Sequence, residues 1–167
     1  MSRKAKSHKQ RNFVLRPDDP TLIKVDEALL TLGRPAHLRR FGERVRAGAG
    51  LPLDRAAYPV LRGIAECGPV RLSDLAPRLG VQVSTASRQV KELEQAGLVE
   101  RTGDPKDGRA SMLALAPAGK EALKKLRESW RRALVEVLED WPEADREALG
   151  VLLGRLAADM VAYGKGG

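Results

Sequence analysis

The sequence predicts an α+β fold that is mostly helical, and three observations support this prediction. Apolar residues recur at intervals of three and four over most of the chain after Pro20, which is the spacing of amphipathic helices. Residues 98–115 instead combine two short strand-like runs with a loop rich in glycine and proline. With 167 residues, of which 43% are hydrophobic, the chain is long and apolar enough to bury a core.

The first helical region is expected after Pro20, with Thr21 as its N-cap. Its apolar spacing continues as far as Val45, but Gly33-Arg34-Pro35 interrupts it. Because this proline has no amide donor and restricts the residue before it, we expect a kink or two separate helices here. The small residues 47–50 then form a linker.

Three helices are predicted in the middle of the chain. The first opens at Asp54 as its N-cap and is ended by Cys67-Gly68-Pro69. The second is short, with Ser73 as its cap and Gly80 as the residue that ends it. The third covers residues 82–96 and carries one apolar face.

A β-hairpin and two long helices complete the chain. Residues 98–102 and 109–115 form the two strands, and the turn-rich loop 103–108 joins them. Residues 118–140 have strongly helical apolar spacing, and Trp141-Pro142 marks the turn to a final helix.

This order of helix, short helix, glycine turn, helix and hairpin is that of a winged helix-turn-helix. Such a third helix needs one face that packs on the preceding helices and one that fits the major groove of DNA. The predicted packing face carries Val83, Ala86, Val90 and Leu93. The predicted DNA-binding face carries Ser84, Thr85, Ser87, Arg88 and Lys91, and no acidic residue occurs between its ends.

The hairpin loop supplies a second group of candidate DNA contacts, Lys106, Asp107 and Arg109. A long cation at a hairpin tip can enter a narrow minor groove, where the negative potential is concentrated. Asp107 would then hold the Arg109 guanidinium by a charge-assisted hydrogen bond. The alternative is that Asp107 and Arg109 form an ordinary turn pair that only closes the hairpin.

A series of motifs through this region is similar to a known family. They are Leu72-Ser73-Asp74-Leu75-Ala76, Leu79-Gly80-Val81, Ser84-Thr85-Ala86-Ser87-Arg88, Leu93-Glu94-Gln95-Ala96-Gly97-Leu98-Val99, Arg101, Asp104-Pro105-Lys106-Asp107-Gly108-Arg109 and Leu115-Ala116-Pro117-Ala118-Gly119. Together they resemble the core of the MarR family of bacterial transcription regulators, over roughly residues 51–120. The helices on both sides are also typical of that family.

The resemblance implies a homodimer in which the N- and C-terminal helices pair and two winged domains bind a pseudo-palindrome. It also implies that Ser84, Thr85, Ser87 and Arg88 enter the major groove, and that Arg109, supported by Asp107, enters the minor groove. Two positions depart from the family pattern. Gln82-Val83 stands where the family usually has a serine-like cap, and Ala116 stands where it often has threonine.

The net charge and the expected helices and strands divide the chain into four parts. The net charge of the whole chain is +8, but residues 1–16 alone carry +6, whereas residues 51–117 carry only +1. The basic arm is either a solvated end or a segment that lies along DNA phosphates or in a minor groove. The four parts are an N-terminal arm (1–16), an N-terminal dimerisation helix region (17–50), a winged helix-turn-helix DNA-binding domain (51–117) and C-terminal dimerisation helices (118–167).

Other candidate sites are weaker. Members of the similar family often bind small anionic aromatic molecules near the junction of the first helix with the DNA-binding domain. This makes His37, Phe41 and Tyr58 candidate ligand residues. The default interpretation of these three residues is that they pack in the core or in an interface. Trp130 and Trp141 are candidate pocket residues, but Trp130 lies on the apolar stripe of its helix, which favours core or dimer packing for it. Cys67 lacks a basic sequence neighbour that would lower the pKa of its thiol, so we interpret it as structural rather than as a redox sensor.

Several classes of protein are excluded or disfavoured. One cysteine and two separated histidines provide no disulfide framework and no local metal signature, and no catalytic motif occurs, so we predict no cofactor, no metal and no enzymatic activity. The sequence has no membrane-spanning or signal segment, which predicts a cytoplasmic protein. We predict a sequence-specific regulator of double-stranded DNA, acting as a homodimeric repressor and controlled by a small aromatic or anionic effector. A nonspecific architectural DNA-binding protein and a protein-interaction module are the alternatives.

Overall fold

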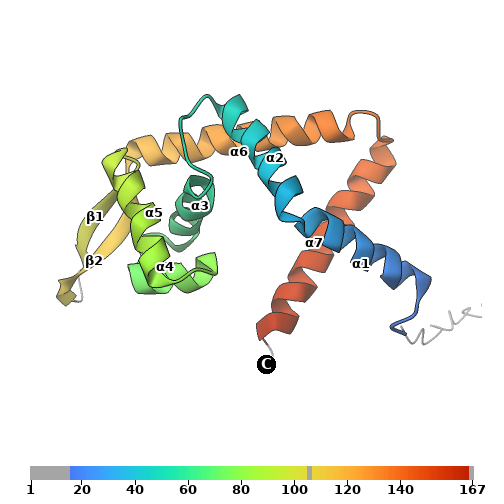
Figure 1. Cartoon of the computed structure of the whole chain (residues 1–167), viewed down its shortest axis with the longest axis horizontal. Helices are drawn as coiled ribbons and strands as arrows, with labels where there is room; N and C mark the ends of the chain where they lie inside the picture. The colour runs from blue at the N-terminus through green and yellow to red at the C-terminus, as the bar shows by residue number, and fades with distance from the viewer. Residues whose placement is uncertain (1–15, 105–106, 166–167) are drawn as a thin grey trace, which may run out of the picture. The chain divides into compact units, whose positions relative to one another are not determined.

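The computed structural model describes residues 16–104 and 107–165. The chain divides into two compact units, with the boundary between Phe41 and Gly42. The elements, labelled in Figure 1, are α1 (Pro20–Gly33), α2 (Pro35–Ala49), α3 (Ala57–Cys67), α4 (Leu72–Leu79), α5 (Val83–Gln95), β1 (Val99–Asp104), β2 (Asp107–Leu115), α6 (Pro117–Leu138) and α7 (Glu143–Lys165). The prediction of a mostly helical winged helix-turn-helix flanked by further helices is confirmed.

The first unit contains α1 and the first part of α2. The predicted interruption is confirmed, since α1 ends at Gly33 and α2 begins at Pro35. The prediction that Thr21 caps α1 is wrong: the cap is Asp19, whose carboxylate accepts a hydrogen bond from the Thr21 amide at 2.8 Å. A carboxylate satisfies the unpaired first-turn donors well, which favours the earlier residue. None of the residues of α1 is buried.

The second unit contains the hydrophobic core. Helix α3 lies at its centre and packs against α4, α5, α6 and β2. The largest fully buried side chains are Val60, Leu61, Ile64, Leu75, Val90, Leu113 and Leu126. Because these residues come from α3, α4, α5, β2 and α6, the core joins the helix-turn-helix to the hairpin and to the long helix that follows.

Two predicted N-caps in this unit are wrong. Helix α3 begins at Ala57, and its N-cap residue is Ala56 rather than Asp54. The Asp54 carboxylate instead accepts a hydrogen bond from the backbone amide of Arg55, the next residue. Helix α4 begins at Leu72, so Ser73 lies inside it. Competition between local side-chain hydrogen bonds and the helix explains why such short polar residues predict caps poorly. The predicted role of Gly80 is confirmed, since it ends α4 with a left-handed backbone (φ +67°).

The hairpin has a regular antiparallel register from Val99 opposite Leu115 to Gly103 opposite Ser111, and a register shift follows. Both strands extend farther toward the tip than the sequence predicted. Leu113 and Leu115 are buried on the inner face, as the period of two predicts. Val70, in the connection before α4, exchanges two backbone hydrogen bonds with Leu113, of 3.0 and 2.8 Å, and so holds the base of the hairpin.

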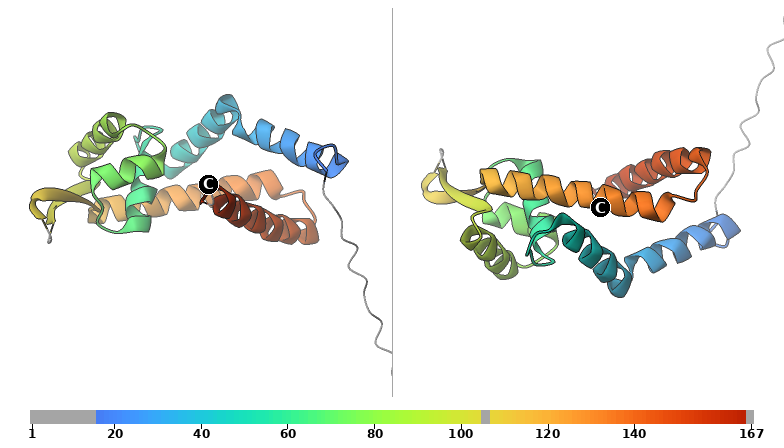
Figure 2. Two further views of the ribbon diagram at one scale, coloured as in Figure 1. Left: turned by 90° about the horizontal axis from the view of Figure 1, so that it is seen from below. Right: turned by 90° about the horizontal axis from the view of Figure 1, so that it is seen from above.

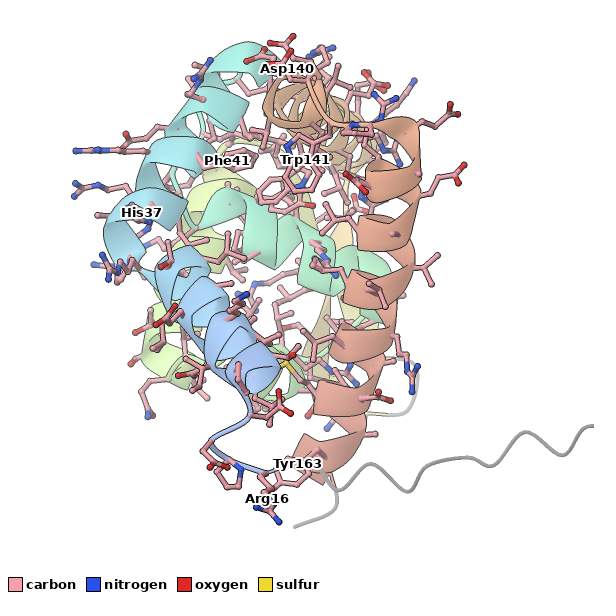
Figure 3. All side chains as sticks on the ribbon, turned by 90° about the vertical axis from the view of Figure 1, so that its right-hand side faces the viewer. Arg16, His37, Phe41, Asp140, Trp141 and Tyr163 are labelled. Carbon is pink, nitrogen blue, oxygen red and sulfur yellow. The ribbon has the colours of Figure 1, made fainter. Side chains whose placement is uncertain are left out.

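The long helix α6 leaves the hairpin and leads to α7 (Figures 1 and 2). The buried Ser129 hydroxyl on α6 donates a 2.7 Å hydrogen bond to the carbonyl oxygen of Val45, which joins the end of α2 to α6. Trp141 lies at the turn between α6 and α7, and Tyr163 lies near the far end of α7 (Figure 3). Residues 143–164 of α7 are all exposed or half-buried in the single chain.

Candidate nucleic-acid interface

Helix α5 has the two unlike faces that the sequence predicts. Ala86 and Val90 are fully buried and Leu93 is 5% exposed, so this stripe attaches the helix to the core. Val83 is an exception, because it is 49% exposed, and the prediction that it packs inward is wrong. It is the first residue of the helix.

The opposite face of α5 carries the predicted DNA contacts. Ser84, Arg88 and Lys91 are exposed, whereas Thr85 and Ser87 are half-buried at the sides of the helix. Neither Arg88 nor Lys91 forms an ion pair with another residue in the part of the chain that the structure describes. Both cations are therefore accessible to a polyanion, with small hydroxyl side chains beside them.

The N-terminus of α5 also lacks its own negative partner. Gln82 is the N-cap residue of α5, and no side chain caps this end by a hydrogen bond. The first turn contains no acidic residue. The first backbone N–H groups of a helix have no partner within it and favour an anion, so this end is electrostatically compatible with a phosphate.

The hairpin forms the second part of the interface, and its tip is only partly described. Lys106 lies outside the described residues. For Asp107 and Arg109 the structure gives the backbone, which belongs to β2, and not the side chains. Their predicted roles in the minor groove therefore stay predictions.

A hydrogen-bond network between α5 and the hairpin was not predicted from the sequence. Arg101 on β1 donates hydrogen bonds from Nε and NH2 to the two carboxylate oxygens of Glu94 on α5, at 2.7 and 3.4 Å. Its NH1 group also donates to the Ser111 hydroxyl on β2, at 3.1 Å. One sequence signal could have located this network. Arg101 lies two residues after the core residue Val99 and so on the same face of β1, where a cation needs a partner.

The candidate ligand residues come from both units. His37 and Phe41 lie one turn apart on α2 in the first unit (Figure 3), and the His37 ring nitrogen Nδ1 lies 3.0 Å from the Thr31 carbonyl oxygen. This contact joins the end of α1 to the start of α2, which gives His37 a structural role. Tyr58, in the second unit, stacks on Trp130 with ring centroids 6.2 Å apart and planes at 11°.

The described part of the chain contains neither a candidate metal site nor a candidate membrane-spanning helix. Among residues 16–104 and 107–165, no group of three His, Cys, Asp or Glu side chains is arranged to hold a metal ion. No helix in the same part combines the length and the hydropathy needed to cross a membrane.

The sequence is similar to that of known transcriptional regulators. The sequence pattern of the MarR family matches residues 53–111. The HTH-type transcriptional regulator YxaD of Bacillus subtilis is 36% identical over 104 residues, which are 62% of this chain and 73% of that protein. A putative transcriptional regulatory protein for the hcr operon of Thauera aromatica is 29% identical over 127 residues, covering 76% of this chain and 75% of that protein.

The fold is also similar to that of solved structures. A MarR family protein from Bacillus stearothermophilus superimposes with a TM-score of 0.73 over 84% of this chain and 96% of that one, at 21% sequence identity. This likeness shows the winged fold with its flanking helices. Because the family pattern matches the helix-turn-helix and the hairpin, and YxaD is 36% identical over 73% of its length, the chain belongs to the MarR family of helix-turn-helix transcriptional regulators, a family of regulators rather than of enzymes.

Proposed function

We propose that the protein is a homodimeric repressor that binds a pseudo-palindromic operator through one winged domain per protomer and that a small effector releases it. The observation that carries the DNA-reading part is α5, where one stripe is buried at Ala86 and Val90 and the opposite face presents Arg88 and Lys91 without ion-pair partners among the described residues. Occlusion of a promoter requires no contact with the polymerase, which favours repression.

The proposed contacts divide between two grooves. Arg88 donates two hydrogen bonds to a guanine edge in the major groove, and Ser84, Thr85 and Ser87 allow the backbone of α5 to approach closely. Lys91 neutralises a phosphate. From the hairpin, Arg109 enters the adjacent minor groove, Asp107 orients it, and Lys106 adds positive charge at the tip.

Unburied apolar residues on the terminal helices support a dimer. On α1, residues such as Leu30 and Leu32 are 62% and 61% exposed, and on α7 Val151 and Leu152 are 71% and 62% exposed. Helix α7 is apolar around much of its circumference, a composition found in helices that are buried on several sides. Exposed apolar surface of this extent marks an interaction site, and a twofold dimer would place the half-sites about one DNA turn apart, roughly 10 base pairs.

A cavity beside Tyr58 supports control by an anionic effector. It has a volume of about 290 Å³ and is lined by the stacked rings of Tyr58 and Trp130 and by Arg62, Glu66, Arg127 and Arg131. Aromatic faces and guanidinium groups together suit a small aromatic anion. His37 and Phe41 belong to the first unit and stay candidate ligand residues.

The test begins with selection of duplexes from a random-sequence library by the full-length protein. Arg88→Ala should weaken binding to the selected duplex more than binding to random duplexes, because only a base contact depends on sequence. Lys125→Ala, on the exposed surface of α6, removes the same charge away from α5 and should lower both affinities little and equally.

Equal losses by Arg88→Ala on selected and random duplexes would contradict the base-reading role. A wild-type protein with the same affinity for both kinds of duplex would instead be a nonspecific architectural protein. For the dimer, sedimentation of Leu152→Glu should give a monomer where the wild type gives a dimer. An unchanged dimer would show that α7 is not the interface.

A further inference from the structure

We propose that Arg101 is a positioning residue that couples the recognition helix to the wing, so that the wing reaches its groove only while the Arg101–Glu94 pair is intact. This inference rests on the wing contact of the proposed function. It assigns to Arg101 an effect on DNA binding through the geometry of the hairpin rather than through a contact of its own with DNA.

Arg101 lies on the inner face of the hairpin. Alternation along β1 puts Arg101 on the same face as Val99, which is 4% exposed, and opposite Leu113, which is fully buried. This is the face that packs on the core. Arg101 stands where the strand passes beyond the core, so its aliphatic stem continues the inner face and its guanidinium emerges beside α5.

Arg101 and Glu94 form a bidentate ion pair. Glu94 receives two guanidinium hydrogen bonds, at 2.7 and 3.4 Å, and the third goes to Ser111 at 3.1 Å. A planar guanidinium bound on two sides fixes direction as well as distance. The side chains of Arg101 and Glu94 are 39% and 25% exposed, so the pair is partly shielded from solvent.

The pair connects the hairpin to α5. The Val70–Leu113 hydrogen bonds attach the base of the hairpin to the core. Gly103 opposite Ser111 is the last regular pair before the register shift toward the tip. Arg101 donates hydrogen bonds to Ser111, in this last regular pair, and to Glu94, at the end of α5. It therefore connects the outer part of the hairpin to the helix that is proposed to enter the major groove. Figure 2 shows the hairpin extending away from the helices.

A double-mutant cycle on the duplex selected by the wild-type protein tests the coupling. In the wild type, Arg109→Ala should lower affinity by roughly 5- to 150-fold, as for a good groove contact. In the background of Glu94→Gln, the same Arg109→Ala change should lower affinity by less than about 2-fold, because the wing no longer reaches its groove.

Glu94→Gln separates positioning from electrostatics. It removes a negative charge near the DNA, so a purely electrostatic role predicts tighter binding, whereas the positioning role predicts weaker binding and loss of hydroxyl-radical protection in the minor groove. Protection of guanine N7 by α5 should persist. Arg101→Lys keeps the charge but not the bidentate geometry, and it should behave like Glu94→Gln; full rescue by lysine would overturn the inference.

The Arg44–Glu136 pair, with 3.0 Å between Arg44 NH2 and Glu136 Oε2, also joins residues that lie far apart in the sequence. Glu136→Gln breaks this pair with the same change of charge as Glu94→Gln, so it is the matched control. It should leave the effect of Arg109→Ala unchanged. Equal effects of Arg109→Ala in the wild type and in Glu94→Gln would overturn the coupling alone. No effect of Arg109→Ala in the wild type would overturn the wing contact and this inference with it, while the role of Arg88 would still stand.

Discussion

Gly119, near the start of α6, lies against the backbone of the chain just before β1. A Cβ atom added to Gly119 would lie 1.9 Å from the carbonyl oxygen of Leu98 and 2.9 Å from its carbonyl carbon. An ordinary carbon–oxygen contact is about 3.3 Å or longer, so the two backbone segments would have to separate by more than an ångström. The Leu98 carbonyl also accepts a 3.1 Å hydrogen bond from the Ala116 amide, which resists its displacement.

We therefore expect Gly119→Ala to lower the free energy of unfolding by about 3 kcal/mol. Overpacking costs about 1–3 kcal/mol, and we expect the upper end because the obstacle is backbone. Loss of the Leu98–Ala116 hydrogen bond would add about 1 kcal/mol, and the better helix propensity of alanine would offset about 1 kcal/mol. For a chain of this size the melting temperature should fall by roughly 6–12 °C.

Urea unfolding followed by circular dichroism, at equal protein concentrations, measures this loss. Gly63→Ala is the control, because its added Cβ would lie 2.9 Å from the Leu75 Cδ1 atom, which is the end of a side chain rather than backbone. We expect the control to change the free energy by less than about 1 kcal/mol. A Gly119→Ala protein as stable as the Gly63→Ala protein would refute the argument that backbone proximity requires glycine here.

Three other predictions follow from the site and the core. Deletion of residues 1–16 should reduce the slope of log affinity against log salt by about 0.9 for each arm cation that contacts a phosphate, as measured by fluorescence anisotropy titrations; an unchanged slope would show that the arm is solvated. Ser129→Ala should destabilise the protein by about 1 kcal/mol in urea unfolding, because the buried Val45 carbonyl loses its hydrogen bond; a neutral effect would indicate that water replaces the hydroxyl. Hydrogen peroxide should not change the DNA affinity of the wild type relative to Cys67→Ala, and a peroxide response present only in the wild type would make Cys67 a sensor.

The sequence determined the order and type of the secondary structure elements, because this information is local. The spacing of apolar residues predicted the helices, and Gly33-Arg34-Pro35 predicted the break between α1 and α2. The ends of elements were predicted less well: Asp54 and Ser73 are not caps, since a short polar side chain can bond to several nearby backbone groups. The motifs in the winged region also led to the family.

The tertiary structure decided how the parts of the interface are connected. The Arg101–Glu94 pair links residues seven positions apart on a helix and a strand, and only the angle between those elements brings the two charges together. The exposure of Val83 and the contact of Gly119 with Leu98 likewise depend on neighbouring segments. Periodicity along the chain specifies which face of a helix is apolar, whereas the path of other segments decides what that face meets, and this second property is not local.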